Sequence, residues 1–313
     1  MSFLQKRALP PFRPSFLRAH QKPLLLAAGL TLAAAAPLAA YAWTCYQEWL
    51  TLGRGGPPYN AIGWLAQALL HPFARRDTRD PLPAPYRSVA DVAALYGPAA
   101  ARSYLAAWAR GRRRPGARPS VPSFVAPQRQ TTERAPAHVV TRQKAFLVAL
   151  ARANPALFEI RDSNLEGPLH QALYLRSFGA GNGNGDGDGD GDGGKDGNGN
   201  GNGGEKRRGE LRTRLGRGSR GEFAHVHGEG STHVTVSAAD AAALVGGGWA
   251  ERHRLSGVGG RRAVVPFGYV LLYAPRGRDE DEFEFEFEFW REAVLAGARY
   301  AAEGAGVEVV VPE

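Results

Sequence analysis

A stretch in which glycine alternates with asparagine and aspartate, residues 179–204, divides this chain of 313 residues. Such a stretch offers no side chains to a core, and glycine loses more backbone entropy on ordering than any other residue. Any hydrophobic core must therefore be built from the segments before and after it. We expect residues 179–210 to form a disordered insertion in a loop between two strands. Calcium binding is a secondary alternative, because the repeat lacks the regular apolar position of calcium-binding β-rolls.

Composition excludes several classes of protein. With 43% hydrophobic residues the chain is not wholly disordered, and a single cysteine excludes a disulfide framework and any cysteine-based zinc or iron–sulfur site. The net charge is +9, and the basic residues gather in three places: residues 1–22, residues 102–118 and the segment after the glycine-rich stretch. No zinc finger, helix-turn-helix or aromatic RNA-binding motif accompanies them, so we expect no nucleic-acid partner.

An uncharged segment follows the basic N-terminal residues. No charged residue lies between Lys22 and Glu48, and residues 23–46 are rich in leucine and alanine and long enough to cross a bilayer. Aromatic side chains gather at the far end of this segment, as they do at membrane interfaces. We therefore predict a basic cytosolic tail at 1–22, a transmembrane helix at 23–46 with the lipid membrane as its partner, and an endomembrane location.

Two other interpretations of the N-terminal segment stay open. Residues 40–42, Ala-Tyr-Ala, fit a signal-peptide cleavage site, which would make the protein secreted. The acid-free first 22 residues also fit a mitochondrial address, although their prolines oppose an amphipathic helix.

The remaining chain shows the mixed periodicity of an α+β domain. We expect a connector with an amphipathic helix at 47–87, then the two parts of one domain at 88–178 and 211–313. Helical patterns cover 60–73, 88–110 with a break at 97–98, 141–153, 238–245 and 283–302. Strand patterns cover 157–160, 169–178, 223–237, 264–273 and 307–311. The predicted fold is a mostly antiparallel sheet flanked by helices and preceded by the transmembrane helix.

Histidines are the main chemical signal, because four of the eight fall within residues 225–253. His225 and His227 are two apart in a strand pattern, so both project from one face. If the short Gly228–Gly230 connection is a hairpin turn, His233 lies beside this pair. Three interpretations are open: a metal site, acid–base chemistry near neutral pH, or unrelated histidines.

Several segments together resemble the fungal luciferase family, the 3-hydroxyhispidin-type luciferases and their luciferase-domain relatives. The segments that carry the resemblance are 46–47, 56–59, 118–120, 128–130, 167–175, 221–227, 231–234, 240, 248–257 and 269–276. The resemblance implies oxidation of a hydroxylated styryl-pyrone or similar aromatic small molecule by O₂, with loss of CO₂ and, in the luciferases, emission of light. It implies no cofactor beyond O₂ as co-substrate.

Such a reaction requires a base for the enol proton and a partner for the anionic peroxide. The candidate bases are His225, His227 and His233. The candidate partners of the oxyanion are His253, Tyr273 and Arg276, and Glu251 is a candidate for orienting a histidine. His170 and Trp249 are candidates for binding the substrate. In the metal alternative, His225, His227 and His233 are the ligands.

Two features depart from the family pattern. The link at 228–230 is shorter than in the luciferases, and residues 282–289 alternate strictly between glutamate and phenylalanine. We expect these phenylalanines to pack on the sheet, with the wall of an apolar pocket as the alternative. The predicted function is thus a membrane-anchored oxygenase of the luciferase-domain type. A non-catalytic ligand-binding domain and a histidine-ligated metal enzyme are the alternatives, and the sequence specifies no oligomeric state.

Overall fold

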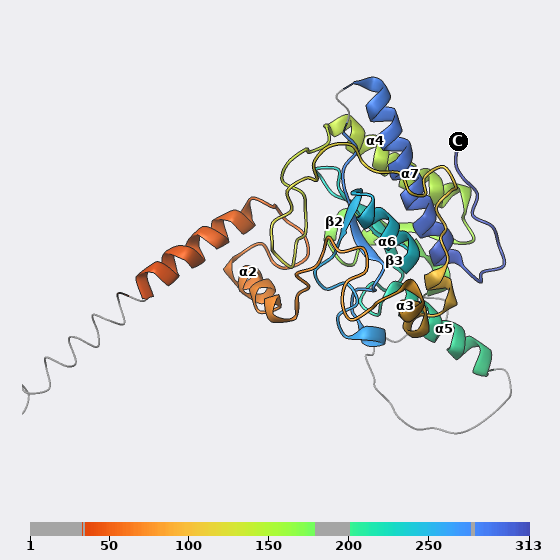
Figure 1. Ribbon diagram of the computed structural model, residues 1–313, viewed down its shortest axis with the longest axis horizontal. Coiled ribbons are helices and arrows are strands. Elements are labelled where there is room, and N and C mark those ends of the chain that lie inside the picture. The colour runs from red at the N-terminus through yellow and green to blue at the C-terminus, as the bar shows by residue number, and fades with distance from the viewer. Residues whose placement is uncertain (1–32, 34, 179–200, 277–278) are drawn as a thin grey trace, which may run out of the picture. The chain divides into compact units, whose positions relative to one another are not determined.

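The structure is a computed structural model that describes residues 33, 35–178, 201–276 and 279–313 (Figure 1). The chain forms two compact units, residues 1–51 and residues 52–313. In the first unit, residues 35–50 are helical. Within the described residues, no helix combines the length and the apolar character needed to cross a bilayer. Residues 23–32 and 34 of the predicted transmembrane segment lie outside the described part of the chain.

The second unit is built on one antiparallel sheet of six strands in the order β1-β2-β3-β4-β6-β5. The strands are β1 (Phe158–Ser163), β2 (Gly167–Leu175), β3 (Glu222–Val226), β4 (Thr232–Thr235), β5 (Ala250–Arg252) and β6 (Tyr269–Leu272). The predicted mixed α+β class with a mostly antiparallel sheet is confirmed. The three-residue strand β5 was not predicted, since it is too short to show an alternating pattern.

The α-helices described in this unit are α2 (Ala61–Ala68), α3 (Val89–Tyr96), α4 (Ala137–Ala153), α5 (Gly201–Leu215), α6 (Ala238–Gly246) and α7 (Glu280–Ala302). Short 3-10 helices cover His71–Phe73, Pro98–Ala101, Arg176–Phe178 and Gly260–Arg262. Ser88 is the N-cap of α3 and forms a capping box with Asp91, each side chain accepting from the other residue's backbone N–H. This local pairing explains where α3 begins.

Alternation along the strands gives the sheet two different faces. Ala224, Val234 and Leu272 belong to the main apolar cluster together with residues of α4, α6 and α7. Helices α4 and α7 pack against each other in this layer (Figure 1), where the rings of Phe146 and Trp290 lie 5.8 Å apart. The histidines of β3 and β4 occupy the alternate positions, so they project from the opposite face.

Helix α7 contains the alternating glutamates and phenylalanines. A period of two on a helix divides the phenylalanines between two stripes, each formed by residues four apart. Phe283 and Phe287 form one stripe, with ring centroids 5.9 Å apart. Phe289 of the other stripe stacks on Trp249 at 3.7 Å. Of the phenylalanines that we expected to pack on the sheet, Phe287 and Phe289 are almost fully buried in the main apolar cluster.

The predicted last strand at 307–311 was wrong. This segment has no strand partner among the described residues, because the buried Asn154 side chain holds it instead: the Asn154 amide donates to the Val310 carbonyl and accepts from the Val310 N–H, each at 2.7 Å. Because the Asn154 side chain satisfies both backbone groups of Val310, this residue needs no neighbouring strand to supply its backbone hydrogen bonds.

Two further helix boundaries differ from the expectation. After Tyr96 the helix ends at Gly97, whose φ of 92° is incompatible with helix. Residues 102–106 are irregular, and residues 107–111 form a turn. Helix α5 begins at Gly201, inside the segment 179–210 that we expected to be disordered. Leu211 and Leu215 of α5 join the main apolar cluster, and this burial stabilises the helix. Residues 179–200 lie outside the described residues.

The contact between α7 and β4 leads to a prediction about two helical glycines. A Cβ on Gly297 would lie 2.6 Å from Val234 Cγ2 and 2.9 Å from the Thr235 carbonyl oxygen, whereas a Cβ on Gly209 of α5 would meet nothing within 4 Å. We expect Gly297→Ala to lower the free energy of unfolding by about 1–3 kcal/mol through overpacking. Gly209→Ala should raise it by up to about 1 kcal/mol, since alanine is the better helix former.

Denaturant unfolding of both variants checks this prediction. Equal stabilisation by the two substitutions would contradict the close approach of α7 to the sheet.

Candidate functional site

The predicted hairpin brings the histidines together. His225 of β3 is the direct cross-strand partner of His233 of β4, and the His227 N–H donates to the Ser231 carbonyl within the connection at 2.9 Å. Directly opposite residues of an antiparallel pair project from the same face. The prediction that Gly228–Gly230 forms a turn and places His233 beside His225 is therefore confirmed.

Four buried side chains converge at this hairpin. Each of Glu166, His225, His227 and His233 offers one nitrogen or oxygen donor atom, and the four atoms lie within 4.8 Å of one another. The three histidines are at most 1% exposed and Glu166 is 7% exposed. Because burying polar groups without partners is costly, the contacts of each member determine what this cluster can do.

Glu222 fixes the orientation of His225. One of its carboxylate oxygens lies 2.6 Å from His225 Nδ1. The same carboxylate accepts hydrogen bonds from the Ser163 hydroxyl, the Tyr174 hydroxyl and the Asn164 N–H. A carboxylate surrounded by donors is ionised, so it accepts the proton of His225 Nδ1 and leaves Nε2 with the lone pair.

A β-bulge places Glu222 on this face. Strict alternation would project residues 222 and 225 from opposite faces. The pairing of β2 with β3 shifts register between Leu173 and Tyr174, so that Leu173 pairs with Ala224 while Tyr174 pairs with Glu222. The shift leaves Phe223 in the apolar cluster and turns Glu222 toward His225.

His227 is held by the connection between β3 and β4. Its Nδ1 lies 2.9 Å from the Ser231 hydroxyl oxygen, and that hydroxyl donates to Glu229 at 2.5 Å. Since the Ser231 proton is used on Glu229, the oxygen accepts from His227 Nδ1–H. Nε2 of His227 then points to Nε2 of His225 at 3.2 Å and to Glu166 at 3.7 Å.

His233 is fixed by β6. Its Nδ1 lies 3.3 Å from the Val270 carbonyl oxygen, which can only accept a hydrogen bond. Its ring stacks on Tyr269 with centroids 4.6 Å apart. Nδ1 of His233 thus carries the proton, and Nε2 carries the lone pair.

Glu166 enters the cluster from the turn between β1 and β2. Its carboxylate lies 2.7 Å from Arg129, and its backbone N–H donates to the Ser163 hydroxyl at 2.9 Å. The backbone of Gly55 passes directly over this ion pair, because a Cβ there would overlap both Glu166 and Arg129. Only glycine allows the loop to come so close.

Two more of the predicted residues lie beside the cluster. The ring of His253 is 5.4 Å from that of His233, and the ring of His170 is 6.2 Å from that of His227. Nε2 of His170 contacts Arg129 at 3.4 Å, while its buried Nδ1 has no partner among the described residues. The structure therefore brings together five of the predicted site residues: His170, His225, His227, His233 and His253.

The electrostatics divide the histidines into two kinds. Burial lowers the pKa of His170 and of His253 to about 4 and holds that of His233 well below its usual value, and the other histidines add to this shift. Burial also opposes the charged form of His227, but neighbouring carboxylates, that of Glu229 first, outweigh it and raise the pKa. The surroundings therefore favour the neutral form of His170, His233 and His253 and the charged form of His227.

The other predicted residues lie in separate networks. Glu251 accepts from Tyr273, Arg79 and Gln128. Arg276 is paired with Glu133 and Glu286.

Trp249 stacks on Phe289 and donates to the Arg112 carbonyl. These contacts support a packing role for Trp249, and none of Glu251, Tyr273, Arg276 and Trp249 has a contact with the histidine cluster among those that the described residues show.

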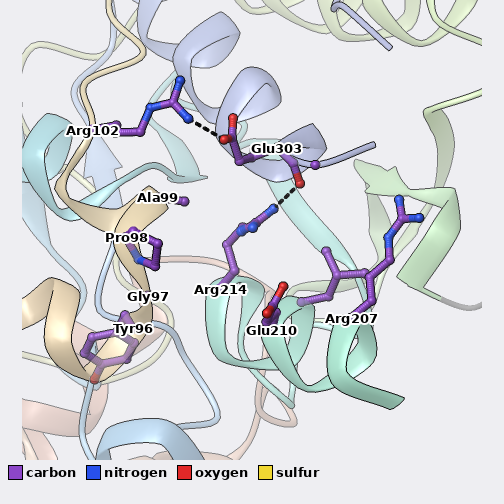
Figure 2. A pocket seen from close by; sticks show the side chains of 11 residues that line it. Tyr96, Gly97, Pro98, Ala99, Arg102, Arg207, Glu210, Arg214 and Glu303 are labelled. Carbon is purple, nitrogen blue, oxygen red and sulfur yellow. Dashed lines mark hydrogen bonds and ion pairs between the residues drawn. The ribbon is translucent and has the colours of Figure 1, made fainter. Parts of the chain in front are cut away.

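Two pockets differ in their relation to the cluster. A surface pocket of about 330 Å³ is lined by Glu166 and by residues of two segments, 54–59 and 167–169. A pocket of about 520 Å³ lies between α5, the C-terminal end of α7 and the segment after α3 (Figure 2). In that second pocket Arg102 and Arg214 both point to Glu303, and no histidine lines it. Only the first of these two pockets reaches the cluster.

Comparison with known families identifies the segment that contains the hairpin. Residues 220–284 match the family model of the luciferase domain. The comparisons with curated proteins and with solved structures gave no match. The luciferase-domain segment includes His225, His227, His233 and His253, whereas Glu166 and His170 lie before it.

Sequence reasoning missed Glu166 and Glu222. Glu166 precedes the predicted strand at 169–178, and nothing in the local pattern relates it to residues some sixty positions later. Glu222 lies three residues before His225, a spacing that alternation assigns to the opposite face. The β-bulge in β3 places Glu222 beside the histidines, and the turn between β1 and β2 places Glu166 there. Both depend on how the strands pair, which the local sequence does not show.

The network around Glu222 leads to a prediction. Glu222→Gln replaces an oxygen acceptor with an amide donor facing the Ser163, Asn164, Tyr174 and His225 donors. We expect a loss of about 3 kcal/mol in the free energy of unfolding, because a buried charge-assisted network is broken. Glu284→Gln is the matched control: Glu284 pairs with Arg142 at the surface, with both side chains 44% exposed, and should cost less than about 1 kcal/mol.

Denaturant unfolding measures both changes, and ¹⁵N spectra of the imidazoles report whether His225 Nδ1 keeps its proton. A fully protonated Nε2 with a bare Nδ1 in the wild-type chain would contradict the assigned tautomer.

Proposed function

We propose that this protein is an O₂-dependent oxygenase of the luciferase-domain type whose reaction takes place at the buried histidine cluster. The substrate we propose is a hydroxylated pyrone or similar enol-bearing aromatic small molecule. The observation that carries the proposal is the convergence of three imidazoles from the segment that the luciferase-domain match covers with the carboxylate of Glu166, which lies before that segment.

The residues of the cluster suit the two demands of this chemistry. An enol must lose its proton before it reacts with O₂, and the lone pair on Nε2 of neutral His233 is the base we assign. The enolate then gives electrons to O₂ as a carbon–oxygen bond forms, which leaves a peroxide anion. The imidazolium of His227 is the cation that stabilises this anion. Breakdown of the peroxide with loss of CO₂ would complete the reaction.

The pocket beside Glu166 is the route we propose for the substrate. Its wall includes Tyr59 and Leu169, whose side chains are 41% and 61% exposed. Large apolar side chains at a pocket suit an aromatic ligand. The loop at 54–59 covers Glu166, so substrate reaches the cluster when this loop moves outward.

Turnover of a hydroxypyrone tests the proposal. We expect the full chain to consume O₂ in air with 3-hydroxyhispidin, and His233→Gln to lower the rate at least about 100-fold, as the loss of a general base does. His138→Gln, on the exposed start of α4, is the matched control and should leave the rate unchanged. Photon counting in the same cuvette shows whether the product forms in an excited state.

Binding of the pyrone without O₂ uptake would overturn the oxygenase and favour the ligand-binding alternative.

We also propose that residues 23–46 anchor the chain in an endomembrane, with the basic tail 1–22 in the cytosol. Support comes from the uncharged sequence between Lys22 and Glu48 and from the charge asymmetry around it. The full chain should stay with membranes after alkaline carbonate extraction, and deletion of residues 1–46 should release it. Release of the full chain by carbonate would contradict the anchor, and an N-terminus that begins after residue 42 would indicate a cleaved signal peptide.

A further inference from the structure

The second nitrogen of each clustered histidine is already used. Nδ1 of His225, His227 and His233 donates to Glu222, Ser231 and the Val270 carbonyl in turn. Each ring is thereby fixed in orientation, and in the neutral form of each ring Nε2 carries the lone pair. A carboxylate, carbonyl or hydroxyl behind the imidazole is the arrangement that orients histidine ligands of metal ions.

The spacing of these nitrogens requires a positive charge between them. Nε2 of His225 and Nε2 of His227 face each other at 3.2 Å. Two lone pairs repel at this distance unless a proton or a metal ion lies between them. A metal ion satisfies both nitrogens at once, and its bonds to imidazole are about 2.0–2.1 Å long, which places neighbouring ligand atoms at about this separation.

The charges around the imidazoles also favour a bound cation. Three buried carboxylates, those of Glu166, Glu222 and Glu229, surround the imidazoles, and each is at most 10% exposed at its side chain. Arg129 is the one guanidinium that contacts any of them among the described residues. With neutral histidines the site holds two negative charges in excess, which a divalent cation neutralises.

We propose that Glu166, His225, His227 and His233 bind one divalent transition-metal ion. Imidazole nitrogens with a single carboxylate favour iron, cobalt, nickel, copper or zinc over calcium and magnesium, which prefer oxygen ligands. An octahedral ion held by these four donors keeps positions open for a small molecule. A bound ion takes up Nε2 of His227 and of His233, so this metal site is an alternative to the metal-free cluster of the proposed oxygenase, in which His233 is the free base and His227 carries a proton.

Cobalt(II) is the probe for this site. Untagged full chain, stripped with a chelator, should bind one Co²⁺ per chain with visible d–d absorption. Zn²⁺ should displace it, and Mg²⁺ should not. His233→Gln and Glu166→Gln should lower the affinity at least about tenfold, and Glu222→Gln should lower it about 10–100-fold through the orientation of His225. His138→Gln should bind as the wild type does.

A measurement on the wild-type chain covers the case in which these variants do not fold. Proton NMR of the Co²⁺-bound protein should show three paramagnetically shifted imidazole N–H signals, one for each Nδ1. Failure of the folded wild type to bind Co²⁺ or Zn²⁺, or binding without these signals, would overturn the proposal.

The measurements of metal binding and of O₂ uptake distinguish failure of the metal site from failure of the oxygenase. Metal bound at these residues without O₂ uptake would support the metal site and overturn the oxygenase. Full O₂ uptake by a metal-free chain that binds no added ion would overturn the metal site and support the oxygenase.

Discussion

Burial of three imidazoles and their carboxylates against one sheet is the constraint on which the centre of this structure depends. Polar groups hidden from water must satisfy one another, and a missing partner costs more than a hydrogen bond contributes. His225 therefore needs Glu222, His227 needs Ser231 and Glu229, and His233 needs the Val270 carbonyl. The surrounding strands and turns are arranged so that each of these partners is present.

The sheet separates this polar face from the apolar one. On the apolar side, Val234 and Leu272 pack in the layer of α4, α6 and α7, which supplies the hydrophobic stabilisation. On the other side, the loop at 54–56 lies close over Glu166 and Arg129. The apolar face thus stabilises the fold, and the opposite face holds the histidine cluster. Because the two faces are separate, the polar groups of the cluster do not interrupt the hydrophobic core.

The alternation at 223–237 and the glycines at 228 and 230 were sufficient to predict the hairpin and the meeting of its histidines, because both depend on local geometry. Helices α3, α6 and α7 were likewise visible in local patterns. The segment 307–311 was mistaken for a strand because its apolar, β-branched residues suit one, whereas a distant Asn154 occupies its backbone groups. The local sequence pattern does not show which group will satisfy the backbone hydrogen bonds of a segment.

The sequence by itself determined which residues share a face of β3 and β4, since side-chain direction in a strand follows from position alone. Only the tertiary structure decided that Glu222 joins them, because the register shift opposite Leu173 and Tyr174 reverses the direction that alternation assigns. It also decided that Glu166 comes from another hairpin to meet His227. Tertiary contacts also decided that Tyr273 and Glu251 lie apart from the histidines. The Glu251 carboxylate accepts hydrogen bonds from Tyr273 and Arg79, so these partners satisfy it without an imidazole.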